Sequence, residues 1–238
     1  MGFRLGTERA DEFLRELQKE YRIFAPKRFE KQGRYSDTDV IRYDEINSIT
    51  EIVTDEKTTY SPKEVILPIT QPIMYFTEDE FRESKSSDKK ILIFMRPCDI
   101  NARVVQDRIF AGNGREDLRE DFYYKRVRER VKFVMMECRS GWDTCFCVSM
   151  GTNRASGYAA AVRFEKDGIL LDVQDNDLLG YLKGASEAAF TPEFVSENET
   201  KVELPIIPDK DALNAIKVHP MWKEYDSRCI GCGACIVI

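Results

Sequence analysis

The sequence has one histidine, His219, and no apolar run near the roughly 20 residues that span a bilayer. A single histidine beside a proline gives no basis for a Ser/His/Asp catalytic triad, so we expect a packing or turn role for His219. The chain also lacks a basic excess, because 36 lysines and arginines face 42 aspartates and glutamates, for a net charge of −6. Duplex nucleic-acid binders usually show a basic footprint. These absences predict neither a nucleic-acid partner nor a membrane partner.

Two further signals are missing. The N-terminus reaches an acidic residue at Glu8, which leaves no room for the apolar segment of a secretion signal. Gly112 and Gly114 lack the third glycine of a dinucleotide-binding fingerprint and do not directly follow a strand. We therefore expect a cytoplasmic protein. In a reducing compartment its seven cysteines should be metal ligands or free thiols rather than disulfides.

What the sequence does contain is cysteine in two groups. Near the C-terminus, Cys229, Cys232 and Cys235 have the spacing C-x2-C-x2-C. This is three quarters of the ferredoxin run C-x2-C-x2-C-x3-C-P, and Gly231 and Gly233 would let the backbone approach inorganic sulfides. The fourth cysteine would fall one residue past the end of the chain, so we expect this [4Fe–4S] ligand set to be completed further on. A zinc loop or free thiols are the alternatives.

The other four cysteines, which we call the inner cysteines, are Cys98, Cys138, Cys145 and Cys147. Cys98 follows the apolar run 91–95, and Cys138 follows the run 132–136. Each run suits a buried strand. Neighbouring strands would bring Cys98 and Cys138 close together, beside the Cys-x-Cys loop that carries the other two.

Four thiolates satisfy both a [4Fe–4S] cluster and an all-cysteine zinc site. Zinc sites favour paired C-x2–4-C knuckles, which the inner cysteines lack, so their irregular spacing fits a cubane cluster better. Free cysteine is also among the most buried residue types. The inner cysteines are therefore predicted to hold a [4Fe–4S] cluster, with a zinc site and unliganded core thiols as the alternatives.

The rest of the chain predicts an α+β (mixed α/β) domain with a central sheet over residues 1–218. Residues 219–238 are predicted to begin a ferredoxin-like dicluster module that is incomplete in this chain. An apolar stripe near the N-terminus predicts a helix that Pro26 ends, and its members are Ala10, Phe13, Leu14, Leu17 and Tyr21. Residues 158–164 and 169–173 predict a β-hairpin.

Several segments of the chain are similar to those of a known family. They are residues 24–26, 35–39, 96–102, 145–153, 194–198 and 219–222. Through them the chain resembles the iron–sulfur electron-transfer subunit of anaerobic sulfite reductase and, more distantly, the β subunit of sulfhydrogenases. The Cys-Phe-Cys and Cys-Asp-Ile segments look shared with the sulfhydrogenases. Residues 148–153 and 195–198 look particular to the sulfite reductase subunit.

The resemblance implies an iron–sulfur electron-transfer subunit of an oxidoreductase complex, an electron carrier rather than the catalytic subunit. In a sulfite reductase its partners would be a flavin- and NADH-binding subunit, together with a sirohaem subunit that reduces sulfite to sulfide. In a sulfhydrogenase it would pass electrons between a flavin protein and a nickel–iron centre. A zinc-stabilised docking module without redox activity is the alternative from another class.

An electron relay has a clear purpose in such a complex. Reduction of sulfite to sulfide takes six electrons, whereas a flavin delivers one or two. The protein would set cluster spacing and potential through burial and hydrogen bonds to the sulfurs. Arg96, Arg139 and the backbone amides around Gly151 are the residues we expect to do this.

Overall fold

The computed structural model describes residues 1–35, 37–84, 87–112, 120–206 and 208–233. The described chain divides into two compact units, Met1–Val202 and Glu203–Ile238. The strands of the first unit are β1 Gly2–Gly6, β2 Tyr21–Phe29, β3 Val40–Glu45, β4 Met74–Phe76, β5 Phe81–Glu83, β6 Lys90–Met95, β7 Val131–Met136, β8 Ala160–Glu165, β9 Gly168–Val173 and β10 Ser186–Glu187. Its helices are α1 Thr7–Leu17, α2 Lys63–Ile66, α3 Pro97–Phe110, α4 Phe122–Arg128 and α5 Asn176–Leu179, with 3-10 turns η1 Ile49–Glu51 and η2 Gly180–Leu182.

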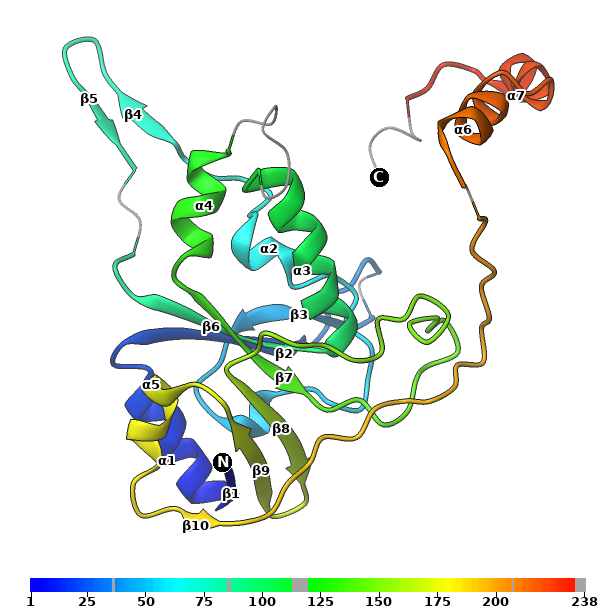
Figure 1. Ribbon diagram of the computed structural model, residues 1–238. Coiled ribbons are helices and arrows are strands. Elements are labelled where there is room, and N and C mark those ends of the chain that lie inside the picture. The colour runs from blue at the N-terminus through cyan, green and yellow to red at the C-terminus, as the bar shows by residue number, and fades with distance from the viewer. Residues whose placement is uncertain (36, 85–86, 113–119, 207, 234–238) are drawn as a thin grey trace. The chain divides into compact units, whose positions relative to one another are not determined.

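Eight of these strands form one mixed sheet, in the order β10-β1-β9-β8-β7-β6-β2-β3 (Figure 1). The central strands β2, β6, β7 and β8 are mutually parallel, and the outer pairs are antiparallel. The predicted strands that precede Cys98 and Cys138 are β6 and β7, and they are neighbours in the sheet. The predicted hairpin is β8–β9. The sequence-based prediction of a mixed α/β class with a central sheet is confirmed.

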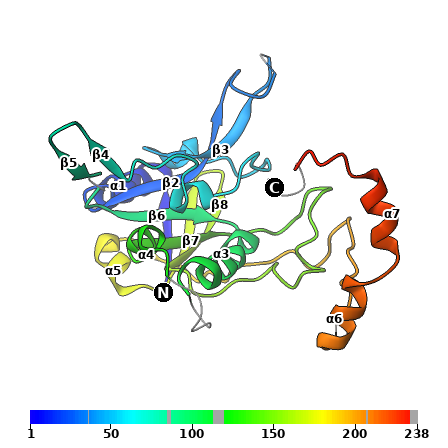
Figure 2. The same cartoon turned by 90° about the horizontal axis from the view of Figure 1, so that it is seen from above.

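Successive residues of the central strands face opposite sides of the sheet and enter two separate cores. From β6, Leu92 and Phe94 pack with the apolar stripe of α1 and with Leu178 of α5. Ile91, Ile93 and Met95 pack on the other side with Ile100 of α3 and Tyr124 of α4. Helices α1 and α5 therefore cover one face, and α2, α3 and α4 cover the other (Figures 1 and 2). Burial on both faces explains why the strand sequences are continuously apolar.

The N-terminal helix exists but is shorter than its apolar stripe predicts. Helix α1 ends at Leu17, and Tyr21 already belongs to β2. Pro26 lies inside β2 rather than marking the end of a helix. Strand β2 pairs with β6 only from Tyr21 to Phe24, so Pro26, which has no N–H, lies beyond the stretch where β6 pairs.

The second unit contains helices α6 Lys210–Lys217 and α7 Met221–Arg228, neither of which buries a residue. Its described residues form no strand, and the ferredoxin-like module stays a prediction. The division between the two units falls between residues 202 and 203. The domain boundary that the sequence predicts, between residues 218 and 219, stays a prediction. Across the described ranges, no helix is long and apolar enough to cross a membrane.

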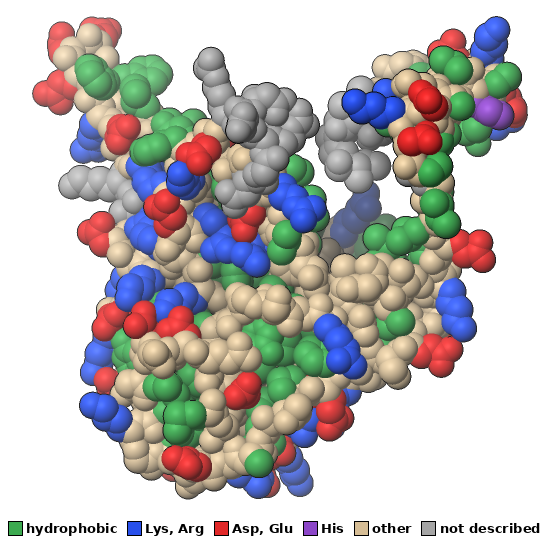
Figure 3. Space-filling view, in the orientation of Figure 1, with side chains coloured by type: hydrophobic (Ala, Val, Ile, Leu, Met, Phe, Trp, Pro, Cys, Tyr) green, Lys and Arg blue, Asp and Glu red, His purple; other side chains and the backbone are tan. Residues whose placement is uncertain are grey.

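A separate two-stranded hairpin, β4–β5, exposes large apolar side chains to solvent. Phe76 and Phe81 of the hairpin are 76% and 78% exposed, and Ile69, which precedes β4, is 83% exposed. Figure 3 shows hydrophobic side chains gathered over the hairpin, with acidic residues beside them. Contiguous exposed apolar patches on soluble proteins generally mark interaction sites.

Candidate metal centre

The carboxyl ends of β6 and β7 place the first two inner cysteines. Met95 and Met135 are paired in the parallel register, so both strands end at the same edge of the sheet. Cys98 lies in the first turn of α3, three residues beyond β6. Cys138 lies two residues beyond β7 and forms a β-bridge with Phe194. Ligand sites in open sheets with parallel strands commonly lie at this edge.

Turns then carry Cys145 and Cys147 back to the same place. The Cys145 amide donates to the Trp142 carbonyl at 2.9 Å, and the Cys147 carbonyl accepts from the Thr152 amide at 2.8 Å. All four inner cysteines line one cavity of about 210 Å³. The other side chains lining it include Lys57, Arg96, Asp99, Trp142 and Phe146. The structure therefore brings together the four thiols that the sequence singled out.

Burial favours the protonated form of two of these thiols, Cys98 and Cys138, in the metal-free chain. Cys98 is exposed as a whole residue, but its sulfur is surrounded by protein. That burial, together with the charges of Asp99, Cys147 and Cys138, raises the thiol pKa to about 12. Burial raises the pKa of Cys138 too, and the Arg96 guanidinium offsets only part of that rise. Metal binding at such a site must displace protons.

Two cations at the cavity are held in place by hydrogen bonds. Arg96 donates to the Thr54 carbonyl at 2.9 Å, and its guanidinium lies 4.3 Å from the centre of the Trp142 ring. Lys57 donates to the Thr144 hydroxyl at 2.7 Å. Positive charge is thus fixed beside the thiols, where it would stabilise thiolates.

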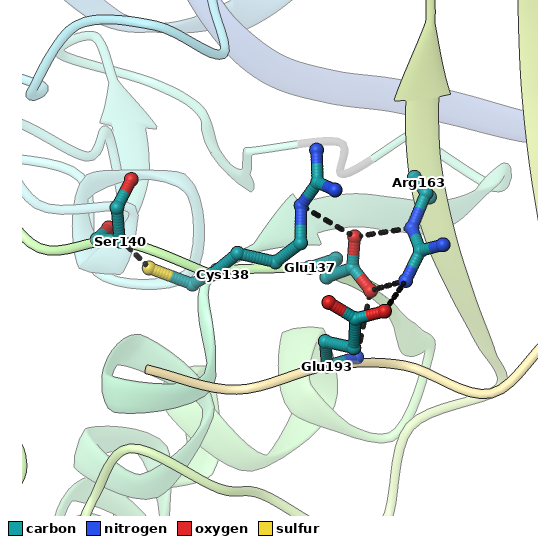
Figure 4. Close-up of polar contacts among 6 residues, drawn as sticks. Glu137, Cys138, Ser140, Arg163 and Glu193 are labelled. Carbon is teal, nitrogen blue, oxygen red and sulfur yellow. Dashed lines mark hydrogen bonds and ion pairs between the residues drawn. The ribbon is translucent and has the colours of Figure 1, made fainter. Parts of the chain in front are cut away.

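A buried ion pair supports the end of β7 on the other side of Cys138. Arg163 donates to the Glu137 carboxylate through Nε at 2.6 Å and Nη2 at 2.5 Å, and the Glu193 amide donates to the same carboxylate at 2.6 Å (Figure 4). The Glu137 side chain is 5% exposed. Figure 4 also shows the Cys138 thiol donating to the Ser140 carbonyl. This arrangement fixes the backbone that carries Cys138.

The segment 194–200 is hydrogen-bonded to the loop that carries Cys145 and Cys147, which we call the cysteine loop. Asn153 donates to the Val195 carbonyl at 2.8 Å, and the Thr200 hydroxyl donates to the Asp143 carbonyl at 2.6 Å. The Asn198 side-chain oxygen accepts from the Val148 amide at 2.8 Å and from the Cys147 thiol at 3.5 Å. Sequence reasoning missed Asn198 as a site residue, because an asparagine in a polar segment has no pattern that separates it from other loop asparagines.

The C-terminal cysteines have no comparable surroundings among the described residues. Cys229 and Cys232 are exposed, and Cys235 lies outside the described residues. Gly231 and Gly233 have φ values of 67° and 70°, a conformation that favours glycine and that suits a tight ligand loop. The Met221 amide donates to His219 Nδ1 at 3.2 Å, so His219 has the turn role that the sequence predicts.

The arrangement as a whole is a mixed α/β scaffold with a four-cysteine cavity at the end of its central strands. No family model matches the chain, and no solved structure matches it. The chain is 25% identical to the protein named sulfhydrogenase 2 subunit beta from Pyrococcus furiosus, over 99% of this chain and 70% of that protein. The similarity is distant, and it covers nearly all of this chain.

Proposed function

We propose that the chain is an iron–sulfur electron-transfer subunit of an oxidoreductase complex, and that Cys98, Cys138, Cys145 and Cys147 hold a [4Fe–4S] cluster. The observation that carries this proposal is the single cavity lined by all four thiols. The four come from two strand ends and one loop, so the rest of the unit positions them before any metal binds.

A single zinc ion fits this cavity less well than a cluster. Zinc is bound by sulfurs about 2.3 Å away, so its ligands must lie close to one another. Among the described residues, no group of three cysteine, histidine, aspartate or glutamate side chains is arranged to hold one metal ion. Each thiolate of a [4Fe–4S] cluster binds a different iron, which needs four sulfurs spread around a larger space.

The charges around the cavity also suit a cluster. When bound, a [4Fe–4S] cluster supplies one-electron transfer, and with four thiolate ligands it carries net negative charge. Lys57 and Arg96 are held at the cavity by hydrogen bonds and offset that charge. The chain's own contribution is to place the sulfurs and supply these cations.

We propose further that Cys229, Cys232 and Cys235 belong to a second, ferredoxin-type [4Fe–4S] site. Their spacing and the left-handed conformation of Gly231 and Gly233 support this. Two clusters in one chain would let it pass electrons between partner subunits. The exposed apolar hairpin β4–β5 agrees with work inside a complex.

Two complexes are candidates for this role. The similarity to a protein named as a sulfhydrogenase subunit favours electron transfer between a flavin protein and a nickel–iron centre. The segments 148–153 and 195–198 support the other candidate, an NADH-dependent anaerobic sulfite reductase with flavin and sirohaem subunits. These two segments contact each other through Asn153 and Val195 beside the cavity.

Metal analysis of the anaerobically purified or reconstituted chain tests the first proposal. We expect about four iron and four sulfide at the inner site. They should be lost in Cys145→Ser and kept in the matched variant Cys229→Ser, and the visible spectrum should be brown. One zinc per chain, or a folded chain that takes up no iron, would refute the inner cluster.

Assays of the intact complex separate the two candidates. The complex is purified through a tag on this chain and supplied with NADH and sulfite in one assay and with hydrogen and polysulfide in another. Sulfite-dependent oxidation of NADH with six electrons per sulfide formed identifies the sulfite reductase. Hydrogen-dependent reduction of polysulfide without sulfite reduction identifies the sulfhydrogenase.

A further inference from the structure

One buried polar atom beside the four-cysteine cavity has no hydrogen-bond partner among the described residues. It is the side-chain nitrogen of Asn198, Nδ2. Asn198 is 6% exposed and is the one polar residue of the described chain in the buried class. A buried donor left unpaired is unfavourable, so such atoms in a folded protein call for an explanation.

The orientation of the Asn198 amide follows from its other contacts. Its oxygen accepts from the Val148 backbone N–H at 2.8 Å, and a backbone N–H needs an acceptor. A flipped amide would place the NH2 group against that donor. Nδ2 therefore occupies the opposite side of the group, away from Val148.

That side of the amide faces Gly141 and Cys145. A Cβ added to Gly141 would lie 2.7 Å from Asn198 Nδ2 and 3.2 Å from the Cβ of Cys145. The absence of a side chain at Gly141 thus leaves a narrow space that the Asn198 amide and Cys145 both border. Gly141 and Cys145 also line the cavity itself.

We infer that Asn198 Nδ2 donates an N–H···S hydrogen bond to a sulfur of the proposed inner cluster on its Cys145 side, either the Cys145 thiolate or an adjacent sulfide. This inference rests on the proposed function, because the sulfur acceptor belongs to the cluster that the inner cysteines are proposed to hold. Hydrogen bonds to cluster sulfurs stabilise the more negative, reduced state and so raise the reduction potential. Asn198 is then a residue that sets the potential as well as one that fixes the cysteine loop.

Asn153 provides a control that separates a purely structural role of Asn198 from the proposed one. Asn153 also joins the cysteine loop to the segment 194–200, through its bond to the Val195 carbonyl. Its Nδ2 already has an acceptor in that carbonyl, unlike the Nδ2 of Asn198. Asn153→Leu removes one hydrogen bond between the two segments. Asn198→Leu removes the bonds from Val148 and Cys147 and, in addition, the unpaired donor.

The experiment compares the wild-type chain, Asn198→Leu and Asn153→Leu after reconstitution with iron and sulfide. Iron content, thermal unfolding and a redox titration followed by EPR are measured for each. We expect the equilibrium constant for one-electron reduction to fall about tenfold in Asn198→Leu, a shift of about 59 mV to lower potential. It should stay at the wild-type value in Asn153→Leu. Equal potentials in all three proteins would overturn the inference.

A second measurement uses the unaltered protein, so the inference stays testable if Asn198→Leu fails to fold or to bind iron. The chain is prepared with ¹⁵N in its asparagine side chains, and the reduced cluster is studied by pulsed EPR. A ¹⁵N hyperfine coupling that is kept in Asn153→Leu and disappears in an Asn198 variant supports the bond. No coupling in a fully loaded wild-type protein refutes it. A wild-type chain that binds no cluster refutes the proposed function instead.

Discussion

The two cysteine groups of this chain contrast in two properties, the regularity of their spacing in sequence and the surroundings of their thiols in the structure. The C-terminal group has a regular ligand spacing, yet Cys229 and Cys232 are exposed in a unit whose helices bury no residue. The inner group has irregular spacing, yet strand ends, turns and a covering segment bring its four thiols around one cavity. Ligand spacing and a preformed site are therefore separate properties.

The difference has a physical origin. Closely spaced cysteines can wrap a cluster with a short loop, so the metal itself can organise the site. Cysteines that are 40 residues apart in sequence, such as Cys98 and Cys138, meet only if a folded core brings them together. The inner site should accordingly depend on the stability of the sheet, and the C-terminal site should not.

The largest expected effect comes from the core under the inner site. Ile93 of β6 is fully buried, and Ile93→Ala should lower the free energy of unfolding by about 4 kcal/mol through lost burial and a cavity. Ile216→Ala in α6, where the residue is 42% exposed, should change it by about 0.5 kcal/mol or less. Urea unfolding of the metal-free chain measures both. Similar losses in the two variants would contradict the expectation that the folded core lies under the inner site alone.

The ion pair beside Cys138 should give the next largest effect. Arg163→Met leaves the Glu137 carboxylate, 5% exposed, without its main partner, and should cost about 3 kcal/mol. It should also weaken iron binding at the inner site. Arg228→Met breaks the pair with Glu224, whose side chains are both more than 60% exposed, and should cost about 0.5 kcal/mol or less. An Arg163→Met chain with wild-type stability and iron content would show that Glu137 does not need this partner.

Glycine substitutions separate crowding at the inner site from backbone strain at the other. Gly141→Ala places a Cβ 2.7 Å from Asn198 Nδ2, so it should cost about 2 kcal/mol and reduce iron bound by the inner cysteines. Gly231→Ala meets nothing within 4 Å, and its φ of 67° should cost about 1 kcal/mol locally. Iron content and thermal unfolding report both effects. Full iron binding by Gly141→Ala would mean that the Asn198 amide moves aside freely.

Much of the scaffold was predictable from apolar patterns. The runs 91–95 and 132–136 belong to strands β6 and β7, which are apolar because both faces of the sheet are covered. The predicted hairpin at 158–173 forms strands β8 and β9. The end of α1 was not predictable from its stripe, because Tyr21 continues the helical spacing but packs as the first residue of β2. Pairing with β6 decides the conformation there, and it involves residues about 70 positions away.

The inner cysteines were identified from sequence, but their surroundings were not. Cysteine is rare enough for four of them after strands and in a loop to attract attention. Arg163, Glu137 and Asn198 are residue types found on any surface, and their roles depend on burial that only the folded chain shows. Polar residues that support a site therefore remain hidden until the contacts are known.

The smallest expected effects concern helix caps, one in each unit. Asp209 accepts from the Ala212 amide at 2.8 Å at the start of α6, and Asp121 accepts from the Tyr124 amide at 2.9 Å at the start of α4. Replacing either with alanine should cost about 1 kcal/mol. Helix α4 packs the buried Tyr124 into the core, so Asp121→Ala should lower the stability of the whole first unit.

Asp209→Ala should instead affect α6 alone, because α6 buries nothing. Hydrogen exchange should show faster exchange confined to α6, with unchanged exchange in β6 and β7 and unchanged iron at the inner site. Faster exchange of β6 or β7 amides in Asp209→Ala would mean that the two units stabilise each other. The C-terminal cysteines would then belong to the same folded framework as the inner ones, and the contrast between the two groups would be one of exposure alone.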